Sequence, residues 1–264
     1  LGSCDMKGGV AVFFELARTV SDPVVDVTYV FYVGEEIAAE HNGLLHLFRD
    51  RPELMAGDVA VLGEPTEATI EAGCQGTMRL RATFTGARAH TARPWKGVNA
   101  IHRMGGLLRA LDEYSERRPV IDGCEYREAL QAVGVDGGVA GNVVPDLSTV
   151  TLNHRFAPDR SAAEAEAHVR EVASMADSIE VLDVAPGAPP SLDHPLLARL
   201  AEGREVRAKL GWTDVARMYE HGVPAVNFGP GDPTIAHTRD EHVTRADVEA
   251  VHAALLDLLT RSDP

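Results

Sequence analysis

The feature that most constrains the fold is an alternation of helix-like and strand-like segments over the first 72 residues. Apolar residues recur at helical spacing in 8–20 and 38–54, whereas 27–33 and 57–66 are apolar runs rich in β-branched residues. Strands that alternate with helices are typical of a mostly parallel sheet covered on both faces. The first segment of the chain therefore predicts an α/β domain.

The second zone, from about 73 to 185, has a different pattern. Residues 76–86 alternate apolar and polar side chains, as in a sheet with one solvated face. A helix is predicted over 99–114, strands over 129–138, 148–158 and 178–184, and a second helix over 161–176, where Ser161 and Glu164 form a capping box. The order β-α-β-β-α-β predicts a ferredoxin-like α+β sandwich.

The third zone returns to the alternation of the first. The Pro- and Gly-rich linker at 185–195 marks a boundary, a strand is predicted over 224–231 and a helix over 244–261. The predicted organisation is one α/β domain, residues 1–74 and 186–264, interrupted by an inserted domain, residues 75–185.

Acidic residues and one histidine follow the predicted strands of the α/β domain. Glu35 and Glu36 come directly after one strand, Glu64 after the next, His237 after a third, and Asp5 precedes the first helix. Ligands of open α/β sheets lie outside the carboxyl ends of the strands. A divalent cation offsets the repulsion between clustered carboxylates, and this donor set suits Zn, Mn or Co. The pattern predicts a metal site.

Each of these residues also has an ordinary structural explanation. Asp5 could cap a helix, Glu64 could be a loop carboxylate, and His237 could be a surface residue. Glu35 and Glu36 could be solvated charges stabilised by a helix dipole. Their shared position at the strand ends of one sheet favours the metal site over four separate explanations.

Composition excludes several classes of partner. With 40 Asp and Glu against 25 Lys and Arg, the formal net charge is −15. Nucleic acids and anionic membranes bind basic surfaces, so neither is expected as a partner. No apolar run reaches the roughly 18 residues of a membrane span. The three separated cysteines, Cys4, Cys74 and Cys124, predict free thiols in a reducing compartment such as the cytoplasm.

Seven short motifs resemble the two-metal aminoacylase and carboxypeptidase family, which includes succinyl-diaminopimelate desuccinylases and acetylornithine deacetylases. They are, in order, CDMKGG, YVGEE, LGEPT, GARAHTARP, GNVVPD, NHRFAPDRS and NFGPGDPTIAHTRDEHV, and they extend over nearly the whole chain. The resemblance implies an α/β catalytic domain with an inserted lid that also forms a homodimer. It implies two divalent ions, Zn²⁺ with Co²⁺ as the alternative.

The resemblance also implies roles for the residues at the strand ends. Asp5 would bridge the two metals, Glu36 would be a terminal ligand of one, and Glu64 a ligand of the other. His237 would be the histidine ligand near the C-terminus. Glu35 would be the general base. A further His-x-Asp motif of the family, which supplies the remaining metal ligand, would precede the first residue of this sequence.

The inserted domain and two loops would contact the substrate. His90 would reach the active site of the partner subunit and stabilise the oxyanion, although by its position alone it could equally be a solvated loop residue. Asn142 and Arg155 would hold substrate carboxylates. Thr213 and Gly231 would line the substrate pocket.

Within the family, the segments IEAGCQGTMR, AGNVVPD and GWTDVAR look most like those of the desuccinylases. The expected substrate is therefore a small N-acyl amino acid, N-succinyl-LL-2,6-diaminopimelate, hydrolysed in lysine and diaminopimelate biosynthesis. An acetylornithine deacetylase, a metallo-dipeptidase, or a catalytically incomplete folding and dimerisation module remain the alternatives.

Overall fold

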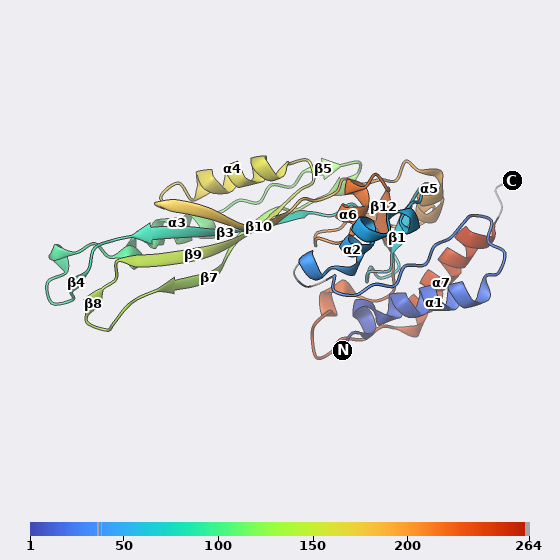
Figure 1. Ribbon diagram of the computed structural model, residues 1–264, viewed down its shortest axis with the longest axis horizontal. Helices are drawn as coiled ribbons and strands as arrows, with labels where there is room; N and C mark the ends of the chain where they lie inside the picture. The colour runs from blue at the N-terminus through green and yellow to red at the C-terminus, as the bar shows by residue number, and fades with distance from the viewer. Residues whose placement is uncertain (36, 38, 262–264) are drawn as a thin grey trace. The chain divides into compact units, whose positions relative to one another are not determined.

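The computed structural model describes residues 1–35, 37 and 39–261, and the chain forms two compact units (Figure 1). Unit 1 comprises Leu1–Cys74, Ile121–Cys124 and Ala188–Pro264. Unit 2 comprises Gln75–Val120 and Glu125–Gly187. The short strands β5 (Val120–Ile121) and β6 (Cys124–Glu125) lie where the chain passes between the two units.

A four-stranded sheet in the order β1-β12-β2-β11 forms the centre of unit 1. The strands are β1 (Ala60–Leu62), β2 (Ile70–Ala72), β11 (Val206–Ala208) and β12 (Ala225–Asn227). β1 pairs with β12 in parallel and β2 with β11 in parallel, whereas β12 and β2 are antiparallel. The prediction of an α/β fold with parallel strands is confirmed.

Helices cover both faces of this sheet. On one face α1 (Gly8–Thr19), α5 (Pro195–Ala201) and α7 (Arg245–Thr260) share a core with Val226 of β12. On the other face α2 (Gly43–Asp50) and α6 (Val215–Glu220) share a core with Ala225, the preceding residue of the same strand. Successive strand residues point to opposite faces, so one short strand anchors two cores.

The described residues of unit 1 also form four short helical turns, and one of these turns contains Asp5. They are η1 (Ser3–Lys7), η2 (Ala39–His41), η3 (Pro52–Leu54) and η5 (Pro233–Ile235). η1 is kinked, because Asp5 and Met6 leave the helical region of backbone space within it.

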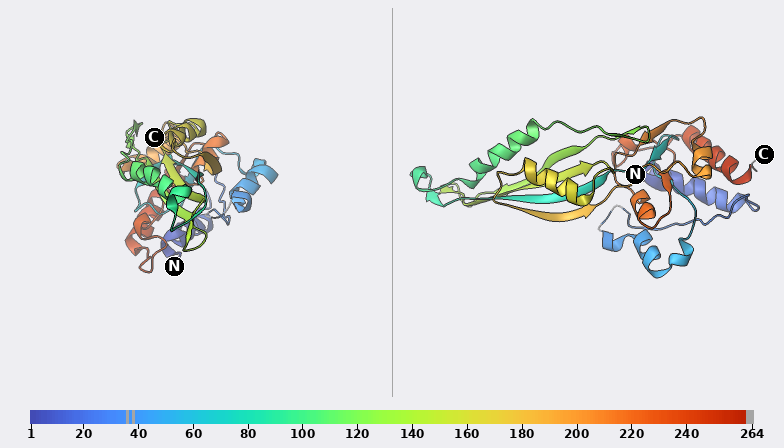
Figure 2. Two further views of the ribbon diagram at one scale, coloured as in Figure 1. Left: turned by 90° about the vertical axis from the view of Figure 1, so that its left-hand side faces the viewer. Right: turned by 90° about the horizontal axis from the view of Figure 1, so that it is seen from above.

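Unit 2 is built on an antiparallel sheet in the order β10-β3-β9-β7. Its elements are β3 (Gly76–Thr85), α3 (Ala100–Asp112), β7 (Ala129–Gly137), β9 (Leu147–Phe156), α4 (Ala162–Val172) and β10 (Ser178–Ala185). Both helices lie over the sheet and share one apolar core with it (Figure 2). The element order and strand order are those of a ferredoxin-like sandwich. A two-stranded antiparallel ribbon of β4 (Ala89–His90) and β8 (Val143–Val144), with the turn η4 (Pro94–Lys96), lies beyond one end of the sheet.

Local sequence signals explain unit 2 well. Every second residue of β9, from Ser148 to Phe156, is buried, which is the period of a sheet with one solvated face. The Ser161 side chain accepts the Glu164 N–H while the Glu164 carboxylate accepts the Ser161 N–H. The predicted capping box is confirmed.

The prediction of a buried strand over 27–33 is wrong. The segment is extended, but among the described residues it has no strand partner, and Phe31 and Val33 are 50% and 80% exposed. The segment is held by contacts other than a strand ladder: Val30 and Tyr32 pack against the core of α2 and α6, and the Val33 carbonyl accepts the Gly43 N–H at 2.8 Å. Apolar β-branched residues favour an extended chain, but a strand exists only where a neighbour supplies ladder hydrogen bonds.

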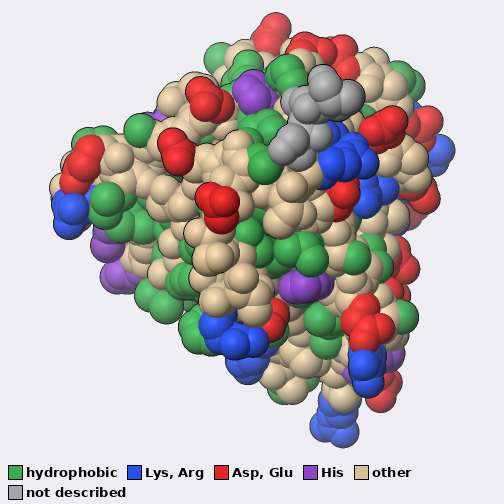
Figure 3. All heavy atoms as spheres, turned by 90° about the vertical axis from the view of Figure 1, so that its right-hand side faces the viewer, with side chains coloured by type: hydrophobic (Ala, Val, Ile, Leu, Met, Phe, Trp, Pro, Cys, Tyr) green, Lys and Arg blue, Asp and Glu red, His purple; other side chains and the backbone are tan. Residues whose placement is uncertain are grey.

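The surface of the described residues carries charges of both signs. On the face drawn in Figure 3, acidic and basic side chains are interspersed with apolar ones. Among the described helices, none combines the length and apolar character needed to cross a bilayer.

Candidate metal centre

Asp5 and His237 lie together, although they are far apart in the chain. The Nε2 atom of His237 is 3.2 Å from Oδ2 of Asp5, and the Asp5 side chain is 15% exposed. His237 has a φ of 62°, in the left-handed region that histidine adopts more readily than most residues. This backbone conformation turns the His237 loop back toward the helical turn that contains Asp5.

Glu241 fastens the Asp5 turn to the His237 loop. Its Oε1 atom accepts the Cys4 N–H at 3.1 Å and the Asp5 N–H at 3.5 Å. Burial alone would raise the pKa of Glu241, but these backbone donors outweigh burial and lower it. The carboxylate therefore stays charged and holds both segments in place.

Cys4 packs beneath this arrangement and is fully buried. Its Sγ atom lies 3.2 Å from the Asp232 carbonyl oxygen. Burial raises the pKa of the thiol to about 11, and the carboxylates of Asp5 and Glu241 contribute to the same shift. A Cβ at Gly231, whose φ is 98°, would lie 2.7 Å from this sulfur. Gly231 is therefore required for the close contact between the two loops.

Two other glycines bring Glu64 to the same edge of the sheet. A Cβ on Gly9 would lie 2.1 Å from the Gly63 carbonyl oxygen, so α1 touches the chain directly after β1. A Cβ on Gly229 would lie 2.4 Å from the Glu64 carbonyl oxygen. Since β1 and β12 are parallel, their carboxyl ends share an edge. The segments that contain Asp5, Glu64 and His237 thus meet there.

Glu35 and Glu64 both lie near the hydroxyl of Tyr32. Burial raises the pKa of Tyr32, and negative charge on Asp214, Glu64 and Glu35 adds to the shift. The Tyr32 hydroxyl donates to Asp214 at 2.8 Å, and Asp214 also accepts from Asn42 at 3.0 Å. Tyr32 therefore connects the loop of Glu35 to the buried carboxylate that precedes α6.

The donor set fits a divalent cation in part. Asp5, Glu64 and His237 supply oxygen and imidazole donors of the kind that Zn²⁺ and Co²⁺ accept. Among the described residues, no group of three or more such side chains is close enough to hold a metal ion. Glu36, the predicted terminal ligand, lies outside the described residues.

Thr213 precedes α6 and is 7% exposed. Its hydroxyl forms a hydrogen bond with the buried Cys74 thiol, which partly opposes the rise that burial causes in the pKa of that thiol. The contact between Thr213 and a bound substrate stays a prediction.

In unit 2 the structure brings His90 and Asn142 together. His90 pairs with Val143 across the β4–β8 ribbon, and the Thr91 N–H donates to the Asn142 carbonyl at 3.0 Å. His90 and Asn142 are both exposed. A ligand or another chain therefore has access to them.

Arg155 lies in the four-stranded sheet of unit 2, toward the end of β9 that is farther along the chain from β8. Eight residue steps of β9 separate it from Leu147, which corresponds to about 27 Å of extended chain. It is half-buried and has no carboxylate partner among the described residues. Burial lowers its pKa, and the charge of Asp183 only partly opposes that shift. A ligand carboxylate would offset this cost.

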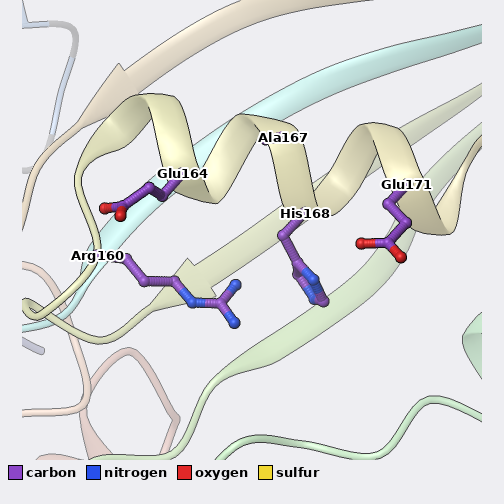
Figure 4. A pocket seen from close by; sticks show the side chains of 5 residues that line it. All are labelled: Arg160, Glu164, Ala167, His168 and Glu171. Atoms are coloured by element: carbon purple, nitrogen blue, oxygen red, sulfur yellow. The ribbon is translucent and has the colours of Figure 1, made fainter.

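A separate hollow of about 390 Å³ lies beside α4 (Figure 4). Its lining residues are Arg160, Glu164, Ala167, His168 and Glu171. Arg160 pairs with the buried Glu128 at 3.4 Å, and His168 contacts the Tyr114 hydroxyl at 2.9 Å. The polar groups of this hollow thus connect α4 and the residue before it to Tyr114 and Glu128 of the same unit.

Comparison with known proteins decides the family. The model of the peptidase family M20/M25/M40 matches residues 1–261. The chain belongs to this family. It is 53% identical to a Mycobacterium tuberculosis protein provisionally named succinyl-diaminopimelate desuccinylase, over 98% of this chain and 73% of that protein. It is 45% identical to a Corynebacterium glutamicum succinyl-diaminopimelate desuccinylase, over the same shares of the two chains.

A solved structure has the same fold as this chain. A tripeptidase from Staphylococcus aureus superposes with a TM-score of 0.73 at 21% identity, over 98% of this chain and 70% of that one. Membership of the family places the chain among hydrolases.

Sequence reasoning missed Glu241 and Tyr32 in this M20/M25/M40 site. Glu241 accepts hydrogen bonds from backbone N–H groups more than 230 positions away, and its signal in the sequence is its place in the motif NFGPGDPTIAHTRDEHV. Tyr32 lies in an apolar run, three residues before Glu35, and its signal is its place in the motif YVGEE.

Proposed function

We propose that this protein is a metal-dependent amide hydrolase that removes the succinyl group from N-succinyl-LL-2,6-diaminopimelate, in lysine and diaminopimelate biosynthesis. The pairing of Asp5 with His237 at 3.2 Å, on the sheet edge where Glu64 also lies, carries the proposal. The similarity to two proteins named as succinyl-diaminopimelate desuccinylases supports the choice of substrate.

Asp5, Glu36, Glu64 and His237 would hold two divalent ions, Zn²⁺ or Co²⁺. When bound, such ions lower the pKa of water toward neutrality and polarise a carbonyl group. The three buried free cysteines support a reducing compartment, the cytoplasm, as the site of action.

The side chains of this protein would supply the remaining chemistry. Glu35 removes a proton from the attacking water and delivers it to the leaving amine. His90 donates a hydrogen bond to the oxyanion that forms at the amide carbonyl. Arg155 makes a bidentate contact with a substrate carboxylate, and Asn142 and Thr213 donate further hydrogen bonds.

The geometry of unit 2 supports a homodimer in which the inserted domain serves two sites. About 27 Å of β9 separates Arg155 from Leu147, and His90 lies on β4, which pairs with the strand β8 that precedes Leu147. We therefore expect that one copy of unit 2 does not place both Arg155 and His90 on one small substrate. A second chain would supply His90 and Asn142. β7 is an edge strand with Val133 and Val135 more than half exposed, and open edges of this kind pair readily with another chain.

A substrate comparison tests the activity. The natural protein, loaded with Zn²⁺ or Co²⁺, should hydrolyse N-succinyl-LL-2,6-diaminopimelate with a kcat/KM well above the values for N-acetylornithine and for a dipeptide. A preference for either of the latter would make the protein a deacetylase or a dipeptidase. No turnover of any of the three would favour a non-catalytic module.

Mixing two inactive variants tests the shared site. His90→Ala and Glu35→Gln dimers should regain activity after subunit exchange, approaching a quarter of the wild-type level per total site. Half of the dimers are then mixed, and one of their two sites keeps both groups. Absence of recovery would mean that His90 acts within its own chain.

A further inference from the structure

His90 ends β4 in a tight turn that fixes its side chain. The Arg93 N–H donates to the His90 carbonyl oxygen at 2.8 Å, and the Ala92 N–H donates to the His90 ring at Nδ1, at 3.0 Å. On the other side, β8 and the contact between Thr91 and Asn142 hold the backbone. The ring nitrogen closest to the main chain therefore faces a donor.

This contact determines which nitrogen carries the proton. A backbone amide can only donate, so Nδ1 of His90 must present its lone pair. A neutral imidazole carries one N–H, and that proton must then be on Nε2. We infer that the Ala92 amide acts as a positioning group that holds His90 as the Nε2–H tautomer, with a hydrogen-bond donor directed away from the turn.

Other histidines of the chain provide internal references. His194 has the same arrangement, because its Nδ1 accepts the Leu196 N–H at 3.3 Å. His154 has the opposite one, since its Nδ1 lies 3.0 Å from the Ala129 carbonyl oxygen and must carry the proton. The structure thus assigns opposite neutral tautomers to His90 and His154.

The assignment deepens the proposed function and rests on it for its catalytic meaning. A developing oxyanion requires a donor, and Nε2–H of His90 supplies one without a net charge. The same proton prevents Nε2 from acting as a base, so proton transfer stays with Glu35. The tautomer itself depends only on the turn.

Long-range ¹H–¹⁵N spectra of histidine-labelled protein test the tautomer. At about pH 8.5, well above the ordinary histidine pKa of about 6.5, His90 should show a pyridine-like Nδ1 and a pyrrole-like Nε2. His154 should show the reverse, and loss of signals in His90→Ala identifies the residue. A pyrrole-like Nδ1 on His90 in the wild-type protein would overturn the inference.

Substitution of Ala92 tests the cause. Ala92→Pro removes the amide hydrogen, so both His90 nitrogens should move toward averaged shifts as the second tautomer becomes populated. Ala92→Gly keeps the amide hydrogen and should keep the wild-type His90 pattern. An unchanged His90 pattern in Ala92→Pro would show that the amide does not set the tautomer.

Substitution of His90 separates the catalytic part from the tautomer. A glutamine places its amide N–H near the position of Nε2, and an asparagine places it near Nδ1. His90→Asn should lose about 10²–10³-fold in kcat, as on removal of an oxyanion donor, and His90→Gln should lose clearly less. If both variants lose kcat equally while wild-type His90 has the expected Nε2–H tautomer, the donor role is refuted and the structural assignment stands.

Discussion

The contact between α1 and the end of β1 allows a quantitative prediction for Gly9→Ala. The new Cβ would lie 2.1 Å from the Gly63 carbonyl oxygen, and real Cβ contacts stay above 3.0 Å. The oxygen is a main-chain atom and the Cβ is bonded directly to the main chain, so no side-chain rotation relieves the overlap. Helix α1 and the segment before Glu64 must separate by about 0.9 Å.

That displacement acts on the candidate metal centre, because Asp5 precedes α1 and Glu64 follows Gly63. Metal ligands tolerate deviations of about 0.2 Å, and a misplacement of about 1 Å can cost roughly 10²-fold in rate. We expect Gly9→Ala to lower both metal affinity and kcat/KM by about 10²-fold. Equilibrium dialysis against Zn²⁺ and steady-state kinetics measure the two quantities.

Gly105→Ala is the matched control. Gly105 is also helical, in α3, and a Cβ there has no heavy atom within 4 Å. Alanine is the better helix former by about 1 kcal/mol, so this variant should be slightly more stable and should bind metal normally. If Gly9→Ala keeps metal affinity and turnover within twofold of wild type, the reasoning from this contact is refuted.

Three further predictions follow from the site and from unit 2. Glu35→Gln should reduce turnover by about 10²–10⁴-fold with metal retained, whereas Glu36→Gln should lose metal; equal metal loss in both would contradict the assigned roles. Glu128→Ala should destabilise unit 2 by about 1–3 kcal/mol in urea unfolding, because the buried carboxylate pairs with Arg117 at 2.7 Å and accepts the Ala157 N–H, whereas Arg117 keeps Asp159 as a partner. Burial raises the pKa of Glu128, but hydrogen bonds from Arg117 and the Ala157 N–H outweigh burial and lower the pKa. The stability that the pair contributes is therefore present above about pH 4.3 and is lost as the pH falls through the lowered pKa. A urea midpoint of the wild-type protein that does not decline over this pH range, or a smaller loss of unfolding free energy in Glu128→Ala, would argue against the pair. Chelation of divalent ions should abolish turnover and lower the melting temperature, since a ligand at 100 times its Kd stabilises the native state by about 2.7 kcal/mol; full activity in excess chelator would exclude metal-dependent catalysis.

Local patterns in the sequence were sufficient to predict the features that depend on residues close together in the chain. The capping box of Ser161 and Glu164 and the alternating burial of β9 both follow from spacing of a few residues. The proximity of Asp5 and His237 agrees with the predicted convergence, but only His237 follows a strand, so the rule for the carboxyl ends of parallel strands explains the place of His237 and not that of Asp5.

Other features depend on distant partners and left no local pattern. Residues 27–33 have the composition of a strand, but strand formation requires a neighbour to supply hydrogen bonds. The three-residue strands β2 and β11 are too short for periodicity to reveal. The role of Glu241 depends on backbone amides from the other end of the chain, and that of Gly9 on one carbonyl oxygen.

The strand order of unit 1 has a consequence for how the protein is made. β1 and β2 do not pair with each other, because β12, at residues 225–227, lies between them. The sheet of unit 2 is complete once residue 185 has been synthesised. We expect the inserted domain to fold first, and pulse-labelled hydrogen exchange during refolding should protect β3 and β9 before β1; simultaneous protection would contradict this order. Until β12 leaves the ribosome, β1 would have no strand partner among the described residues, and the exposed apolar residues around it would be a natural substrate for chaperones.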